Sequence, residues 1–360
     1  MASIGIKEMV NACVGDKQAK KVMIGEEVVW DSEPIDTTPL TFTAVEAGVE
    51  VYMEGSVSVA LDYSTDGTNW SNYTIGDHIT LSNIGDIVMF KATTTNTTFT
   101  TRNVSWQGQV TLTYNRFVFT GKATMSGRLT SLLNGDPNVF AKMTDITQTD
   151  CFNRLFYKNK YLVGDIDLSY IRAVADGVFA ETFSLDGVTG TTGYGITSCD
   201  LSGIKKIGSS CTTSQSSTIP AFYATFDSQA NMTTLDMSGF VNDQVPDDQA
   251  GSLNNICYNC PSLTTVKLQN LRKLYQNGLY YAFSGCSSLV EIDLSRLERV
   301  YSGTWKYTFN GCSALRTVKL NKLGYSFNDG STSDAYTFNN CAVTLIDLSE
   351  IEGIPKKFME

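Results

Sequence analysis

Residues 288–300 read Ser288-Leu-Val-Glu-Ile-Asp-Leu-Ser-Arg-Leu-Glu-Arg-Val300, and this stretch decides the fold of the 360-residue chain. Its apolar residues lie at Leu289, Ile292, Leu294 and Leu297, an L-x-x-L-x-L-x-x-L spacing. Alternation around Leu294 predicts a short strand that turns Ile and Leu inward and Asp and Ser toward water. One such strand cannot bury its inner face alone, so the stretch predicts a stack of similar units.

Variants of this stretch recur through the second half of the chain, which is typical of leucine-rich repeats. The residues two before and three after each equivalent of Leu294 are also apolar or Cys. The repeats therefore predict a solenoid with a parallel sheet of about seven rungs. The equivalent positions are Leu168, Leu201, Met237, Leu268, Leu294, Leu320 and Leu348.

The residue before each reference position is expected to face water. It is Asp in most repeats and Lys at positions 267 and 319. We expect each lysine to lie between aspartates of the neighbouring rungs and to relieve their repulsion, at about 0 to 1 kcal/mol for each exposed pair.

Composition limits the classes of partner. The formal net charge is −10 and the sequence pI is about 4.7, so binding to a phosphate backbone or an anionic membrane is disfavoured. The first residues lack the pattern of an export signal, and no apolar run has the length of a membrane span. Nine cysteines, four of them at one recurrent repeat position, favour reduced thiols in a cytoplasm.

The first 38 residues are too few for an independent core and are interpreted as a docking arm. Two apolar segments flank Gly25-Glu26 between Lys20 and Trp30, which predicts a hairpin. Residues 31–39 contain two prolines and no hydrophobic pattern, so they are expected to form a linker. The candidate docking side chains are Val22, Ile24, Val28 and Trp30.

Residues 39–122 contain short runs rich in Thr, Val, Tyr and Phe, separated by Gly, Asn and Asp. This spacing predicts a small β-sandwich domain of immunoglobulin-like type. Residues 123–150 are expected to be a connector with a turn or two of helix. The solenoid is predicted to occupy residues 151–360, so the whole chain is expected to be mainly β.

No motif predicts catalysis, a metal or a cofactor, and we expect no enzymatic activity. Cys257-Tyr-Asn-Cys260 lacks the two further ligands that a structural zinc site needs. His78 is remote in sequence from any candidate nucleophile. Phe precedes Cys by three residues in several repeats, so the same position of each repeat carries a thiol. These thiols are predicted to stack on adjacent rungs. They are expected either to be free and to point inward, or to lie close enough to form disulfides. The repeat cysteines are Cys260, Cys286, Cys312 and Cys341.

Aromatic residues cluster near the turns of the later repeats. They are expected either to form a surface that binds sugar or protein, or to cover the back of the solenoid. The candidate adhesion residues are Tyr301, Trp305, Tyr307 and Tyr325.

Units with the pattern Phe-x-Gly-Cys-x-x-Leu-x-x-Ile-Asp-Leu, as at Phe283 to Leu294, resemble the BspA-like leucine-rich repeats of gut Bacteroidetes and their viruses. The region from Leu40-Thr-Phe-Thr-Ala to Tyr63-Ser-Thr-Asp-Gly-Thr-Asn-Trp70 and on to Leu133 resembles the β-domain that precedes such repeats in virion proteins of crAss-like tailed phages. The segment from Lys20 to Trp30 is similar to a short element of phage structural proteins.

The resemblance implies a virion protein assembled in the host cytoplasm, most simply a capsid (head) fibre or decoration protein. Its arm would dock on capsid or tail proteins, and its repeats would serve adhesion to a host surface or glycans. The alternatives are a tail fibre, a bacterial surface adhesin with the same repeats, and a polysaccharide-degrading enzyme. Little sequence remains after Leu348 to cover the last rung, so a second copy or the β-domain is expected there, with a homodimer or homotrimer as the assembly.

Overall fold

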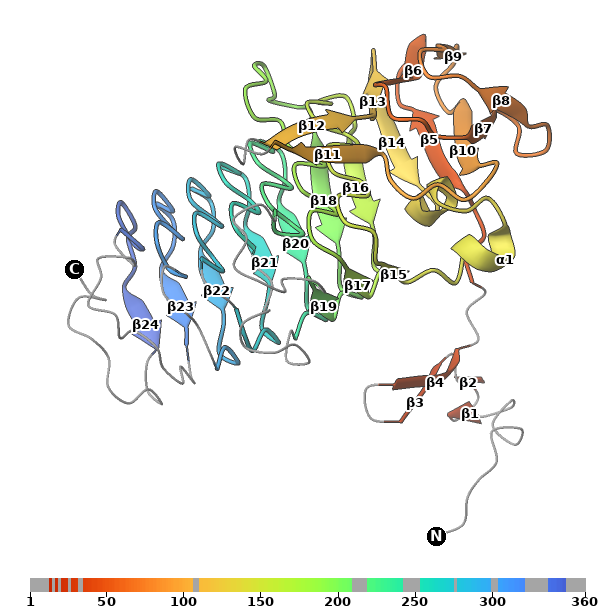
Figure 1. Cartoon of the computed structure of the whole chain (residues 1–360). Helices are drawn as coiled ribbons and strands as arrows, with labels where there is room; N and C mark the ends of the chain where they lie inside the picture. Colours follow the sequence, from red (N-terminus) through yellow and green to blue (C-terminus); the bar gives the residue numbers. More distant parts are fainter. Residues whose placement is uncertain are drawn as a thin grey trace. The chain divides into compact units, whose positions relative to one another are not determined.

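The computed structural model describes residues 13–14, 17–18, 21–24, 27–31, 35–105, 110–208, 219–241, 253–274, 277–298, 304–320 and 336–347. The chain divides into two compact units, residues 1–37 and 38–360. The described residues are mainly β (Figure 1), with one short α-helix, α1 (Pro137–Phe140), and one 3-10 helix, η2 (Leu129–Leu132). The predicted fold class is confirmed at this level.

The first unit contains two small antiparallel pairs. Strands β1 (Cys13–Val14) and β2 (Lys17–Gln18) form one, and β3 (Lys21–Ile24) and β4 (Glu27–Asp31) form the other. The hairpin predicted around Gly25-Glu26 is confirmed, with Val22 opposite Trp30. The side chains of the candidate docking residues lie outside the described part of the chain, so their docking role stays a prediction.

The second unit begins with two antiparallel sheets. The larger has the order β14-β5-β10-β7-β8 and the smaller β13-β6-β9, while β11 and β12 form a separate hairpin. This order does not confirm an immunoglobulin-like topology. The strands are β5 (Leu40–Ala44), β6 (Val49–Glu54), β7 (Leu61–Ser64), β8 (Ser71–Tyr73), β9 (Ile79–Leu81), β10 (Ile87–Ala92), β11 (Thr100–Val104), β12 (Val110–Tyr114), β13 (Arg116–Phe119) and β14 (Ala123–Ser126).

The connector predicted over residues 123–150 is only partly a connector. Its first four residues are strand β14, which pairs with β5 and buries Ala123 and Met125. The alternation Ala-Thr-Met-Ser places these two apolar side chains on one face. The segment's last strand, β15 (Asp145–Ile146), pairs in parallel with β17 (Ala173–Val174) of the repeats.

The repeats form a β-solenoid, and each of its ladders contains at least three parallel strands (Figure 1). One ladder is β15-β17-β19, which ends with β19 (Lys206–Ile207). The strands that carry the repeat motif form a sheet of four and a sheet of three, so one ladder of seven rungs is not confirmed. They are β16 (Gly164–Asp167), β18 (Ile196–Asp200), β20 (Thr234–Asp236) and β21 (Thr265–Lys267), then β22 (Glu291–Asp293), β23 (Thr317–Lys319) and β24 (Leu345–Asp347).

Pairing within these two sheets follows the alignment of the repeats. Ile166 lies opposite Cys199, and Ile292 lies opposite Val318. Leu294 is fully buried, as the alternation predicts. Full burial of such a side chain contributes about 1.5 to 3 kcal/mol. Because side chains alternate along a strand, a one-residue slip of register would expose the whole inner face and lose this contribution at each position.

The third side of the solenoid consists of turn segments that precede the motif strands, and we call it the turn face. Alternate N–H groups of each segment donate to carbonyls of the next, as from Phe152 to Val178 and from Phe283 to Thr308. Phenylalanines stack beneath this face, with ring centroids 5.4 Å apart for Phe156 and Phe183. Backbone groups that would otherwise be buried without partners are satisfied between successive segments.

The two-sheet region covers the first edge of the solenoid. Phe117 donates from its N–H to the Leu155 carbonyl at 2.8 Å, and its ring stacks on Phe156 at 5.7 Å. Arg102 adds an ion pair to Asp150 at 2.6 Å. The β-domain was one of two candidates for covering the last rung, and the structure places it at the opposite end. Residues after 347 lie outside the described part of the chain.

Among the described residues, no helix is both long and apolar enough to cross a membrane.

Candidate functional site

The structure separates the four predicted adhesion residues. Trp305 is fully buried beneath the turn face, so its prediction as a surface residue is wrong. It occupies the inward position that Phe179 and Phe222 hold in earlier segments. Tyr307 is half-buried on the turn face, as a binding residue could be. Tyr301 and Tyr325 lie outside the described residues.

One backbone position of the turn face has a positive φ in every described segment. Its φ values run from 49° to 63°, the left-handed region that costs most L residues about 1 to 2 kcal/mol. Asn and Gly adopt it most easily. The successive occupants are Arg154, Glu181, Ala224, Asn255, Tyr281, Tyr307 and Tyr336.

The last three occupants form a stack of tyrosines on the surface. The ring centroids of Tyr281 and Tyr307 are 4.5 Å apart with planes 11° from parallel, and those of Tyr307 and Tyr336 are 5.1 Å and 10°. Tyr280 and Tyr258 meet Tyr281 edge-on at 4.6 and 5.8 Å. We call these five residues the tyrosine face; its most exposed member, Tyr336, is 58% exposed.

Stability does not account for three tyrosines at this position. An aromatic pair contributes about 0.5 to 1.5 kcal/mol beyond burial, which about offsets the left-handed strain of each residue. Asn, which occupies the equivalent position 255, would avoid most of that strain. The left-handed conformation itself is shared by all seven occupants and belongs to the scaffold, so only the choice of tyrosine is specific to this half.

A second row runs beside the tyrosines, three residues further along each segment. We call Ser284, Asn310 and Asn339 the amide row. The Asn339 amide donates to Asn310 Oδ1 at 2.9 Å, and the Ser284 hydroxyl donates to the Asn310 carbonyl at 3.1 Å. The three residues bond to one another from segment to segment; Ser284 is buried, and Asn339 is the exposed end of the row.

Earlier segments of the same face carry charges instead. Arg154 pairs with Glu181 at 2.7 Å and lies over the rings of Tyr114 and Tyr157. The pKa of Asp227 is raised to about 6, mainly by burial and also by the nearby carboxylates of Asp186 and Glu181, against a hydrogen bond from Ser228. The turn face therefore has a charged half and a tyrosine half.

The repeat cysteines donate hydrogen bonds from their thiols. Each thiol donates to a backbone carbonyl of the preceding segment, as from Cys286 to Cys257 O at 3.1 Å and from Cys312 to Phe283 O at 3.0 Å. Gln229 fills the same position in an earlier segment and donates to Phe183 O at 2.5 Å. Among the residues with described side chains, the cysteines are free thiols, which agrees with the first of the two predicted states.

The C-x-x-C motif is a variant of the repeat motif. Cys257 stands where other segments have phenylalanine, and Cys260 holds the usual thiol position with its hydrogen bond to Phe226 O at 3.0 Å. Both are fully buried, and burial raises the pKa of Cys257 well above its ordinary value, with the neighbouring Cys260 adding to the shift. Within the described residues, no group of three or more His, Cys, Asp or Glu side chains could hold a metal ion.

The outward aspartates of the strand face have a structural role that the sequence did not suggest. Asp293 accepts the N–H of Ser295 at 2.9 Å, and Asp167, Asp200 and Asp236 make the same bond two residues on. Lys267 contacts Asp236 at 2.6 Å, which is one of its two predicted partners. Lys319 contacts Glu291 at 2.5 Å, a partner that was not predicted.

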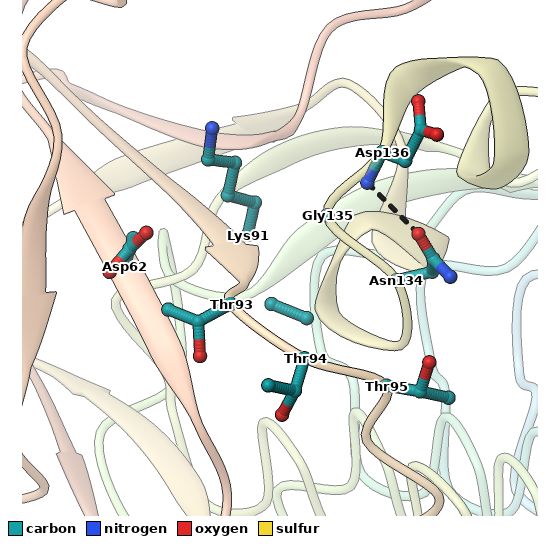
Figure 2. Close-up of a pocket in the computed structure, with 9 residues that line it drawn as sticks. Asp62, Lys91, Thr93, Thr94, Thr95, Asn134, Gly135 and Asp136 are labelled. Carbon is teal, nitrogen blue, oxygen red and sulfur yellow. Dashed lines mark hydrogen bonds between the residues drawn. The ribbon is translucent and has the colours of Figure 1, made fainter.

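A cavity of about 400 Å³ lies in the two-sheet region (Figure 2). It is bordered by Asp62 and Lys91, which lie opposite each other on the paired strands β7 and β10, by Thr93 to Thr95, and by the loop that precedes α1. Asn134 accepts the Asp136 N–H at 2.9 Å, and Asp136 caps α1, so both serve the local turn. Asp62 Oδ1 is buried without a hydrogen-bond partner, but no second group converges on it to define a chemistry.

His78 lies on the surface of the two-sheet region, in contact with Tyr52 and Glu50. Its ring stacks on Tyr52 at 3.9 Å, and Nδ1 lies 2.9 Å from Glu50 Oε2 on an exposed surface. It therefore forms a surface pair.

No protein family, curated protein or solved structure matches this chain.

Sequence reasoning placed Tyr281 and Tyr336 in the aromatic cluster near the repeat turns but did not single them out as adhesion residues, although a signal was present. Tyrosine stands two residues before Phe283, Phe309 and Phe338 in the three segments that end in Cys286, Cys312 and Cys341. An alignment centred on these phenylalanines, rather than on the strand leucines, would have placed the tyrosines in one row.

Proposed function

We propose that the chain is a structural protein of a phage virion, most simply a capsid (head) fibre or decoration protein that adheres to a host surface or its glycans. In this proposal the two-sheet region is an immunoglobulin-like domain. The repeats form one BspA-like leucine-rich-repeat solenoid of about seven coils. The arm at residues 1–37 docks on the virion, and the protein acts without enzymatic activity, as a homodimer or homotrimer.

The observation that supports adhesion best is the tyrosine face. Tyrosine is enriched at recognition surfaces because its ring is apolar and its hydroxyl forms hydrogen bonds. Here three stacked rings occupy strained backbone positions that asparagine would fill at lower cost. A separate compact arm of 37 residues accounts for attachment without using this surface.

Location on the particle tests the proposal directly. Gold-labelled antibody against the solenoid should decorate the heads of purified virions in electron micrographs. Labelling confined to tails would favour the tail-fibre alternative, and labelling of host envelopes without particles would favour the bacterial adhesin. Absence of label from particles that are otherwise complete would refute a virion role.

An enzymatic role is tested separately. The purified protein is incubated with host capsule, and new reducing ends are measured over time. We expect none above a heat-inactivated sample. Sustained turnover would replace the structural proposal with a polysaccharide-degrading enzyme.

A further inference from the structure

The chemistry of the tyrosine face narrows the class of ligand. The ring faces of Tyr281 and Tyr307 cover each other, with centroids 4.5 Å apart, so a ligand meets ring edges and hydroxyl groups rather than open ring faces. Burial raises the pKa of Tyr281, and the neighbouring tyrosines raise it further, in part through a hydrogen bond between the Tyr281 and Tyr307 side chains. The amide row adds Asn310 and the exposed Asn339, whose side chains also bond to each other.

The backbone of this face is not free to pair with a peptide strand. The N–H groups of Tyr281, Phe283 and Gly285 all donate to carbonyls of the next segment. Strand addition requires an unpaired edge, so the ladder disfavours an extended peptide as the occupant. The side chains alone must carry recognition.

Charge disfavours a polyanion. The chain has a net charge of −10, and the adjoining half of the turn face carries Asp186 and Asp227 besides the Arg154–Glu181 pair. On the tyrosine half, Lys306 lies 5.9 Å from the ring centres of both Tyr280 and Tyr307. One lysine among phenols and amides suits a neutral ligand that is rich in hydroxyl groups.

We propose that the tyrosine face and the amide row together bind a neutral, linear polysaccharide that lies along the solenoid axis. The proposal rests on the adhesive function above and specifies its ligand. Sugar hydroxyls bond to the phenols and to Asn310 and Asn339, and the positively polarised ring edges lie against sugar oxygens. The rings repeat at 4.5 and 5.1 Å, so successive coils present the same contacts to successive parts of an extended polymer.

The decisive variant replaces three tyrosines by asparagine: Tyr281→Asn, Tyr307→Asn and Tyr336→Asn together. Asparagine already occupies the equivalent position 255 with φ 57°, so the variant keeps the backbone conformation. The matched control is Glu181→Asn, at the same backbone position on the charged half. Far-ultraviolet circular dichroism and the urea midpoint establish that both variants are folded.

Binding is measured by affinity electrophoresis of the full chain in gels that contain a linear β-glucan, α-mannan or galactan, with polygalacturonate as the anionic probe. We expect retardation by at least one neutral polymer, a loss of affinity of at least tenfold in the triple variant, and unchanged affinity in Glu181→Asn. Failure to bind any neutral polymer, equal binding by the triple variant, or a preference for polygalacturonate would overturn the proposal.

These outcomes are distinct from those for the virion role. If antibody against the protein labels particles but the protein binds no neutral polymer, the ligand proposal fails and the virion proposal stands. If the protein binds the polymer through the three tyrosines but is absent from particles, the ligand proposal stands and the virion proposal fails.

Discussion

The two halves of the turn face share one backbone and one type of core but differ in their outward side chains. In both, alternate N–H groups bond to the next segment and phenylalanines stack beneath, with Phe183 and Phe226 5.7 Å apart in one half and Phe309 and Phe338 5.6 Å apart in the other. The charged half presents Arg154 and Glu181, whereas the tyrosine half presents stacked phenols. A repeated scaffold thus leaves the left-handed position open to different surface chemistry.

The shared core predicts that both halves are equally sensitive to a buried charge. Leu201→Asp and Leu294→Asp each place an unpaired carboxylate at a fully buried site, and we expect each to lose more than about 4 kcal/mol of unfolding free energy. Leu345→Asp is the control, because this leucine is 53% exposed. Urea midpoints measure all three, and a tolerant Leu294→Asp variant would mean that the strand register is wrong.

The charged half should respond to pH through Asp227. Its pKa is raised from 3.8 to about 6 in the folded protein, so between these values the folded state holds a proton that the unfolded state releases. Stability should therefore fall as pH rises from about 4 to 6, by at most about 3 kcal/mol. Asp227→Asn should abolish this loss and be the more stable protein at pH 7. Urea titrations of both proteins from pH 4 to 8 measure this. A difference in unfolding free energy between the two proteins that stays constant over this range would contradict the assignment.

The two halves also differ in the side chain that donates a hydrogen bond to the backbone carbonyl of the preceding segment. Gln229 donates to Phe183 O and accepts the Ile196 N–H at 3.1 Å, whereas Cys286 makes one thiol bond. We expect Gln229→Ala to cost about 2 to 3 kcal/mol and Cys286→Ala about 1 to 2, because more buried groups lose partners in the first. Equal losses in chemical denaturation would show that the second bond of Gln229 contributes nothing.

The smallest effect on stability is expected on the tyrosine face. Tyr307→Asn removes ring stacking but relieves left-handed strain, so the two terms offset to within about 1 kcal/mol. Phe309→Asn, two residues further and fully buried, is the contrast and should cost several times more. Thermal unfolding of the pair measures this, and a large loss in Tyr307→Asn would assign the stack to stability rather than to binding.

The sequence by itself determined the mainly β class, the arm hairpin and the pairing of the motif strands. Each follows from local alternation or from a repeat that aligns buried residues such as Ile292 and Val318. It also indicated free thiols. These features depend on which residues are apolar and how they are spaced, and both are visible in the printed chain.

Only the tertiary structure decided which aromatic residues reach the surface. Trp305, Tyr307 and Phe309 are spaced by two, and simple alternation would send all three to one side. The left-handed backbone of Tyr307 interrupts that alternation, so Tyr307 faces outward while Trp305 and Phe309 are buried. The stacking of Tyr307 with Tyr281 and Tyr336 then depends on hydrogen bonds between segments. The packing of the two-sheet region against the first edge of the solenoid also depends on such hydrogen bonds. Such contacts join residues far apart in the chain, and local sequence does not specify them.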